Sequence, residues 1–423
     1  MYDIVITWSI ILLAVFLIHL LTIIDARLRK ILFIALITRL VLMVIEVYIY
    51  SGLPYLTAAD AGRFQGRAIV FYHTFTLKEL LLPPYPSGSG LYSYIMAILY
   101  SFLGTDNSTI IRAVNILAGV FTVYNAYHIS NMLWSRKIAL QNALILAIFP
   151  LLVVYAQNPI RESFVVYFMT LGILFYVYWS QKKKPYYLII SVFGFALSTA
   201  LHMAALMALL ALILYYIWRA LSSLLTGKIY SLINTIIVIA VVGVGLYYLN
   251  STGWGLSTIG GEGAIGEFGV EELIERRGGD RRAGRAAYLE GMVATSPLDV
   301  FWQTPVRMTY FLFTPFPWMM SSVWDFVGLF DSLLYVLIIF GIYRSIPVLR
   351  EDPEKLALLF MLIGMVIAFA WGVTNYGTAM RHRAKLIPLA ICLAPHIYPL
   401  RKLAYNELRK KWMVVFTSKY LRG

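Results

Sequence analysis

Long apolar runs follow one another along nearly the whole chain and predict membrane-spanning helices. A helix needs about 20 apolar residues to cross the hydrocarbon of a bilayer, and eleven runs approach that length. We place the spans at 4–24, 31–52, 108–133, 137–155, 163–179, 186–200, 203–220, 230–250, 321–344, 356–373 and 384–399. A shorter apolar stretch at 91–104 is predicted to be an interfacial helix within the loop 53–107. The pattern predicts an all-α fold, a polytopic transmembrane helical bundle in a single membrane domain, 1–423.

The composition agrees with a membrane protein. Hydrophobic residues make up 60% of the chain and charged residues only 13%, and the mean hydropathy is +0.76. Soluble domains usually carry about 25% charged residues. The apolar runs are continuous rather than alternating, which favours helices over a transmembrane barrel. The single cysteine, Cys392, excludes a disulfide within the chain.

Lysine and arginine are distributed unevenly between alternate loops. If the N-terminus is external, six segments fall inside and carry 20 of the 35 Lys and Arg residues, as the positive-inside rule requires. These segments are "DARLRK", "SRK", "SQKKKPYY", "RALSSLLTGK", "YRSIPVLREDPEK" and the basic cytoplasmic tail 400–423. The net charge of +14 is therefore explained by orientation in a plasma or inner membrane and by attraction to anionic membrane lipids. No nucleic-acid partner is indicated.

The opposite, external face holds three loops that attract functional interest, 53–107, 251–320 and 375–385. Arginine is unexpected on this face, yet all three loops contain it, and guanidinium groups bind phosphate oxygens bidentately. We interpret the charged segment "EELIERRGGDRRAGR" as a solvated stretch whose charges pair locally, with a lid function for the second loop as the alternative.

Three segments resemble the glycosyltransferase-C superfamily in their order and spacing. They are "ITRLVLMVIEVYIYSGLPYLTAADAGRFQGRA", the stretch from "LPPYPSGSG" to "NPIRESFVVYFMTLGI", and "NYGTAMRHRAKLIPLAICLA". Together they cover about residues 35–179 and 371–395. The resemblance, which includes dolichyl-phosphate-mannose-protein mannosyltransferases, implies an integral membrane glycosyltransferase. Such an enzyme takes a sugar from a polyprenyl-phosphate or pyrophosphate donor on the external face and transfers it to a glycan, lipid or protein acceptor.

In that superfamily an acidic residue of the first external loop is catalytic, and Asp60 is the matching residue here. A carboxylate can act as the general base that deprotonates an acceptor hydroxyl. Arg63 and Arg67, one and two helical turns further on, are predicted to keep Asp60 ionised and to face the donor phosphate. The alternative is that Asp60 only caps the helix beginning at Ala61.

A second group of cations, Arg381, His382, Arg383 and Lys385, is predicted to bind the donor phosphate. Residues 381 and 383 would diverge by about 200° on a helix. We therefore expect the stretch before Ala384 to be non-helical, with a turn at Asn375 and Gly377 that leaves backbone N–H groups free for oxyanions.

Arg161 and Glu162 in "NPIRES" are candidates for contact with the acceptor or with a divalent cation such as Mg²⁺ or Mn²⁺. The alternative is that Glu162 is simply an acidic residue at a helix N-terminus after Pro159, where the helix dipole favours negative charge. His202 is interpreted as a packing residue. The chain contains no nucleotide-binding or hydrolase motif. An O-antigen or exopolysaccharide polymerase or ligase remains open as a second function. A lipid-linked glycan flippase is a third, although the sequence lacks the internal repeat typical of transporters.

Overall fold

The computed structural model describes residues 2–49, 60–82, 89–224, 235–240, 243, 286–321 and 325–395. Within these ranges the regular structure is helical throughout, and the one β-type contact is an isolated bridge between Ala287 and Asn375. The predicted all-α class is confirmed. The tail 400–423 and the charged segment 271–285 lie outside the described residues.

Among the described residues, seven helices are long and apolar enough to cross a membrane, and the protein is therefore an integral membrane protein. They are α1 (Tyr2–Leu21), α2 (Ala26–Val44, extended by a π-helical turn over Ile45–Ile49), α6 (Ser108–Leu133), α9 (Glu162–Lys182), α11 (Leu206–Leu224, preceded by a 3₁₀ turn over Met203–Ala205), α15 (Asp325–Glu351) and α16 (Pro353–Gly372). Two more helices, α10 (Pro185–Leu201) and α17 (Tyr376–Leu393), overlap predicted spans but are shorter or more polar. The run 230–250 lies mostly outside the described residues.

The run 137–155 was predicted to be one span, and the structure corrects this to two helices. α7 (Arg136–Ile148) and α8 (Pro150–Ala156) meet at an angle of 56°. The cause is Pro150, which favours extended backbone at the preceding residue, and Phe149 has ψ 121°. The pair can still cross as one bent span, which gives up to eight crossings by this test among the described residues.

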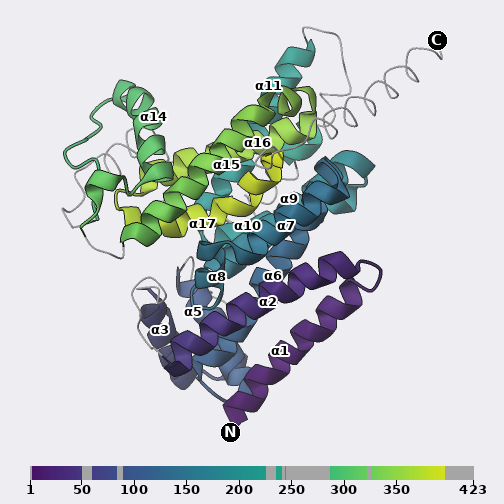
Figure 1. Ribbon diagram of the computed structural model, residues 1–423, viewed down its shortest axis with the longest axis vertical. Helices are drawn as coiled ribbons and strands as arrows, with labels where there is room; N and C mark the ends of the chain where they lie inside the picture. Colours follow the sequence, from purple (N-terminus) through teal and green to yellow (C-terminus); the bar gives the residue numbers. More distant parts are fainter. Residues whose placement is uncertain are drawn as a thin grey trace.

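Helix α6 lies at the centre of the N-terminal part of the bundle. It packs against α1, α2, α7 and α9, and it is buried along most of its length, whereas α1 lies at the outside (Figure 1). Helices α9 and α10 pack closely, because Gly172 and Gly194 let the two backbones approach. α17 contacts α6, α9, α15 and α16 and thereby links the N-terminal and C-terminal parts.

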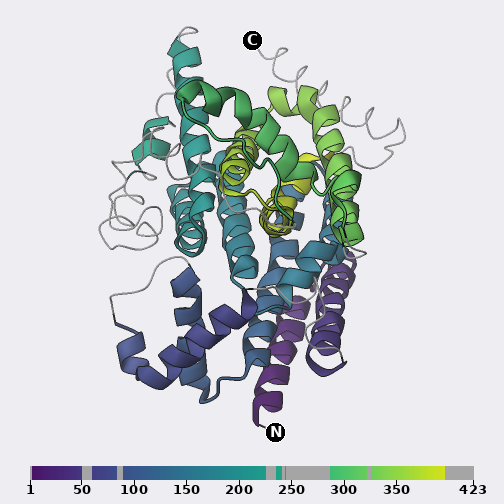
Figure 2. The ribbon, with the colours of Figure 1, turned by 90° about the vertical axis from the view of Figure 1, so that its left-hand side faces the viewer.

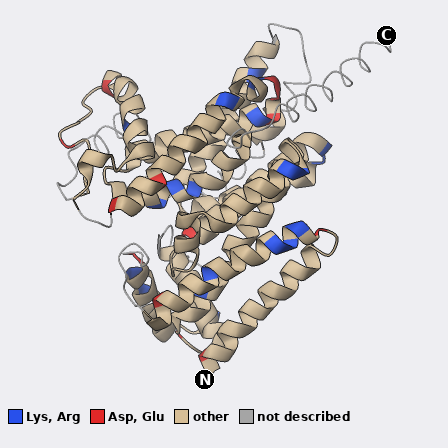
Figure 3. Cartoon of the chain, in the orientation of Figure 1, with Lys and Arg blue, Asp and Glu red and all other residues tan. Residues whose placement is uncertain are grey.

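The two ends of the bundle differ in structure and charge. Short helices gather at one end, on the left of Figure 1 and facing the viewer in Figure 2. These are α3 (Ala61–Thr74), α4 (Leu77–Leu80), α5 (Ser89–Leu103) and α14 (Pro297–Phe313). In Figure 3, Lys and Arg residues gather at the right-hand end, beside the α1–α2 turn, and again near the middle of the view at α17. The stretch predicted as an interfacial helix forms α5, which packs on α3 through the rings of Phe64 and Tyr92.

Candidate functional site

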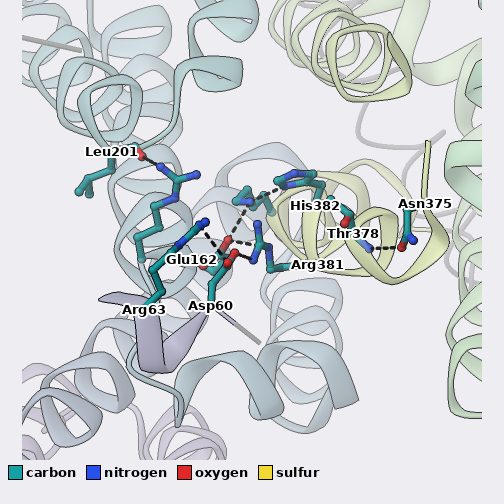
Figure 4. Close-up of polar contacts among 10 residues, drawn as sticks. Asp60, Arg63, Glu162, Leu201, Asn375, Thr378, Arg381 and His382 are labelled. Carbon is teal, nitrogen blue, oxygen red and sulfur yellow. Dashed lines mark hydrogen bonds and ion pairs between the residues drawn. The ribbon is translucent and has the colours of Figure 1, made fainter. Parts of the chain in front are cut away.

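Asp60 directly precedes α3, but its side chain does not cap that helix. The residue has φ −81° and ψ −11°, and its carboxylate accepts no capping hydrogen bond. Its Oδ1 lies 2.9 Å from the guanidinium of Arg63, one helical turn on, and its Oδ2 accepts from Arg381 of α17 (Figure 4). The interpretation of Asp60 as a helix cap alone is therefore wrong.

Glu162, the first residue of α9, is a buried carboxylate that meets two cations of α17. Its Oε1 lies 3.2 Å from Nε of Arg381 and 3.2 Å from Nζ of Lys385, and its side chain is 2% exposed. Residues 381 and 385 are one helical turn apart, so α17 presents both cations on one face. Arg381 consequently joins two carboxylates that lie far apart in the sequence.

His382 extends this cluster toward α10 and α16. Its Nδ1 lies 2.7 Å from Lys385 Nζ, and its ring stacks on Phe369 with centroids 4.9 Å apart at an interplanar angle of 17°. The ring of His202 approaches His382 edge-on at 5.0 Å. Burial, reinforced by the positive charge of Lys385, lowers the pKa of the His202 imidazole well below its usual range. His202 is therefore uncharged at neutral pH.

Arg161 lies beside the cluster and is directed elsewhere. Its guanidinium donates to the carbonyl oxygen of Leu201 at 2.8 Å and lies 5.9 Å from the ring centroid of Phe64. This arrangement connects the start of α9 to the end of α10 and to α3. Arg161 therefore holds together the three helices that surround the site, α3, α9 and α10.

The expected non-helical stretch before Ala384 is wrong. Helix α17 begins at Tyr376, and the Asn375 side chain caps it by accepting hydrogen bonds from the backbone N–H groups of Gly377 and Thr378. Figure 4 shows the bond from Thr378. Those N–H groups are thus occupied. The sequence signal was sound, because Asn is a favoured cap residue, but it marked a helix start rather than an oxyanion turn.

Because α17 is helical here, Arg383 lies apart from Arg381. The guanidinium of Arg383 is fully buried, contacts Asp331 of α15 at 2.8 Å, and donates to the carbonyl oxygen of Thr314 at 2.7 Å. The expectation that both arginines reach one phosphate is therefore corrected: Arg381, His382 and Lys385 come together, and Arg383 joins α17 to α15.

The chain resembles known proteins in part of its sequence and in its fold. Residues 89–248 match the family model of dolichyl-phosphate-mannose-protein mannosyltransferase. The crystal structure of ArnT from Cupriavidus metallidurans bound to undecaprenyl phosphate is similar with a TM-score of 0.48 and 12% identity, over 90% of this chain and 62% of that chain. The Archaeoglobus fulgidus oligosaccharyltransferase, tethered with an acceptor peptide, is similar with a TM-score of 0.51 and 13% identity, over 88% of this chain and 50% of that chain.

The chain has the glycosyltransferase-C fold. It spans less than two thirds of the length of either solved chain. No curated protein matches it in sequence.

Two predicted features of the site are less prominent than expected. Arg67 is exposed and forms no ion pair with any residue that the structure describes. Among those same residues no three His, Cys, Asp or Glu side chains are grouped as a metal site requires. Asp60 and Glu162 are instead paired with Arg and Lys side chains.

Two residues of the cluster were not predicted as site residues. Phe369 supports the His382 ring, and His202 contacts both. Phe369 is one of 24 phenylalanines in the chain and carries no distinguishing sequence signal. His202 is a single histidine between two apolar runs, a pattern typical of a packing residue. Their neighbourhood depends on how α10, α16 and α17 pack, which single-sequence patterns do not contain.

Proposed function

We propose that this protein is an integral membrane glycosyltransferase that moves a sugar from a polyprenyl-phosphate donor to an acceptor hydroxyl. The observation that carries the proposal is the contact between the Asp60 carboxylate and Arg381, which belong to segments 321 residues apart. It unites a carboxylate suited to proton abstraction with cations suited to a phosphate. The match to a family named for dolichyl-phosphate-mannose supports this donor class.

The charged residues of the cluster and His382 have distinct roles in the proposed reaction. The acceptor oxygen attacks the anomeric carbon, its proton passes to Asp60, and the bond from that carbon to the phosphate oxygen breaks. Arg381, Lys385 and His382 stabilise the charge that grows on the departing phosphate, with Arg63 at the opening of the site. Glu162 holds Arg381 and Lys385 in place and is not itself required to exchange a proton.

We infer that the reaction takes place on the external face of the membrane. The site lies at the end with α3 and α14, opposite the α1–α2 and α9–α10 turns, beside which Lys and Arg residues gather (Figure 3). Basic turns favour the cytoplasmic side. External enzymes meet lipid-linked sugars rather than nucleotide sugars, and the sequence contains no nucleotide-binding motif.

Replacing Asp60 with Asn tests the assignment of the base. Because Asp60 does not cap α3, Asp60→Asn should fold normally, yet turnover should fall by roughly 10²-fold or more. Turnover would be measured with polyprenyl-phosphate mannose as the first donor. Glu79→Gln, which neutralises an exposed carboxylate in nearby α4, is the matched control and should retain activity. Near-normal transfer by Asp60→Asn would contradict the assignment of Asp60 as the base, and a lack of transfer by the wild-type protein would favour the polymerase or flippase functions instead.

A further inference from the structure

Arg381 holds its two carboxylates with different parts of the guanidinium group. Nε faces the buried Glu162, and the terminal nitrogen Nη1 donates to Asp60 (Figure 4). Glu162 is 2% exposed, whereas the side chains of Asp60 and Arg381 are 22% and 19% exposed. The contact with Glu162 is thus the buried anchor, and the contact with Asp60 is the one a ligand entering from solvent can reach.

The same contact occupies the proposed base. Oδ2 of Asp60 accepts from Arg381, and Oδ1 pairs with Arg63. An acceptor hydroxyl must donate its proton to one of these oxygens, and a phosphate must bind the fork that Arg381 now turns toward Oδ2. The carboxylate of Asp60 and a donor phosphate therefore compete for one guanidinium.

We propose that Arg381 exchanges partners when the donor binds. The terminal nitrogens leave Asp60 for the donor phosphate while Nε keeps its contact with Glu162, and Oδ2 of Asp60 becomes free for the acceptor hydroxyl. This inference rests on the proposed function and adds an order to it: the donor binds first, and its phosphate exposes the base to the acceptor.

The other cations near Asp60 are less suited to this exchange. Lys385 is held between Glu162 and His382 with 1% of its side chain exposed, and no contact joins it to Asp60 among the described residues. Arg63 is 61% exposed and belongs to the helix that begins beside Asp60, so it can stay on Oδ1 throughout. Arg381 alone in the described cluster touches both carboxylates.

The exchange predicts coupled changes in affinity for undecaprenyl phosphate, used as the probe. Asp60→Asn removes the competitor and should tighten binding by about 3- to 10-fold, while Arg381→Gln should weaken it by about 10-fold or more. When Asp60→Asn is combined with Arg381→Gln, its gain in affinity over the Arg381→Gln variant should shrink to less than about 2-fold, because no guanidinium is left to be released. Arg381→Lys, which keeps the charge without the fork, replaces Arg381→Gln if that variant does not fold.

Two controls separate exchange from general electrostatics. Asp106→Asn neutralises a carboxylate that pairs with His73, away from the cluster, and should leave affinity unchanged. Undecaprenol, which lacks the phosphate, should bind equally to wild type and Asp60→Asn. Unchanged or weaker binding of undecaprenyl phosphate by Asp60→Asn would overturn the proposed exchange. An equal gain in affinity from Asp60→Asn with Arg381 and with Arg381→Gln would overturn it as well. If undecaprenyl phosphate binds no variant, the donor class of the proposed function fails as well.

Discussion

Lys385 and Arg381 are two cations that share the buried carboxylate of Glu162, and Arg381 also contacts Asp60. Glu162 Oε1 lies 3.2 Å from both, and no more than 2% of the Glu162 and Lys385 side chains is exposed. Buried charges are costly unless paired, and removing one partner leaves the others uncompensated. Glu162 therefore contributes to the packing of α9 against α17.

Glu162→Gln should lower the free energy of unfolding by roughly 3 kcal/mol, because it removes a buried carboxylate partner from two cations, of which Arg381 keeps Asp60. Lys385→Met in the same chain removes one of them and should restore at least half of that loss. Thermal unfolding of the purified protein measures both effects. Glu351→Gln, at the exposed end of α15, is the control and should change little. Strictly additive costs of the two substitutions would contradict the interaction.

Residue types pointed to several side chains that the structure brings together, but they did not predict how those side chains are arranged. An acid in the first external loop and a cationic stretch near the C-terminus pointed to Asp60 and Arg381 through the resemblance to a superfamily. Arg383 was grouped with Arg381 because it is nearby in sequence, but helical geometry turns it toward Asp331. Which neighbour each face of α17 meets is decided by tertiary packing.

At the scale of elements, hydrophobic runs predicted most helices, and their boundaries were set by single residues. Pro150 divides the run 137–155, and Asn375 starts α17 eight residues before the predicted span at 384. These effects follow from backbone chemistry, since proline restricts the residue before it and Asn accepts from the first N–H groups of a helix. The apolar pattern alone contains neither.

The contact between α9 and α10 depends on having no side chain at Gly194. A Cβ there would lie 2.8 Å from the backbone nitrogen of Gly172 and 3.0 Å from the carbonyl oxygen of Phe168. Since backbone cannot move aside as a side chain can, Gly194→Ala should destabilise the protein by about 2 kcal/mol. Gly66→Ala in α3 meets nothing within 4 Å and should stabilise by about 0.5–1 kcal/mol. Melting temperatures that move in the same direction would contradict this packing.

At the scale of the whole molecule, the proposed function depends on sidedness. The cluster of Asp60, Glu162 and Arg381 lies toward the end that carries α3 and α14. Two backbone hydrogen bonds join the loop that precedes α14 to the start of α17, from Tyr288 N–H to Thr374 and from Tyr376 N–H to Ala286. The helical turns at the other end carry consecutive lysines, 182–184. A site that takes lipid-linked sugars externally requires these lysines to be cytoplasmic.

Cysteine labelling of intact cells with a membrane-impermeant maleimide tests this orientation. Thr74→Cys at the end of α3 and Glu290→Cys before α14 are exposed at the end that carries the site and should react from outside. Lys184→Cys, exposed at the α9–α10 turn, should react only after permeabilisation, because the positive-inside rule keeps that turn in the cytoplasm. The one native cysteine, Cys392, is fully buried, so the parent protein supplies a low background. Labelling of Lys184→Cys from outside would show the opposite orientation in the membrane and would exclude an external donor. Opposite labelling of Thr74→Cys and Glu290→Cys would separate the two loops that the site requires on one face.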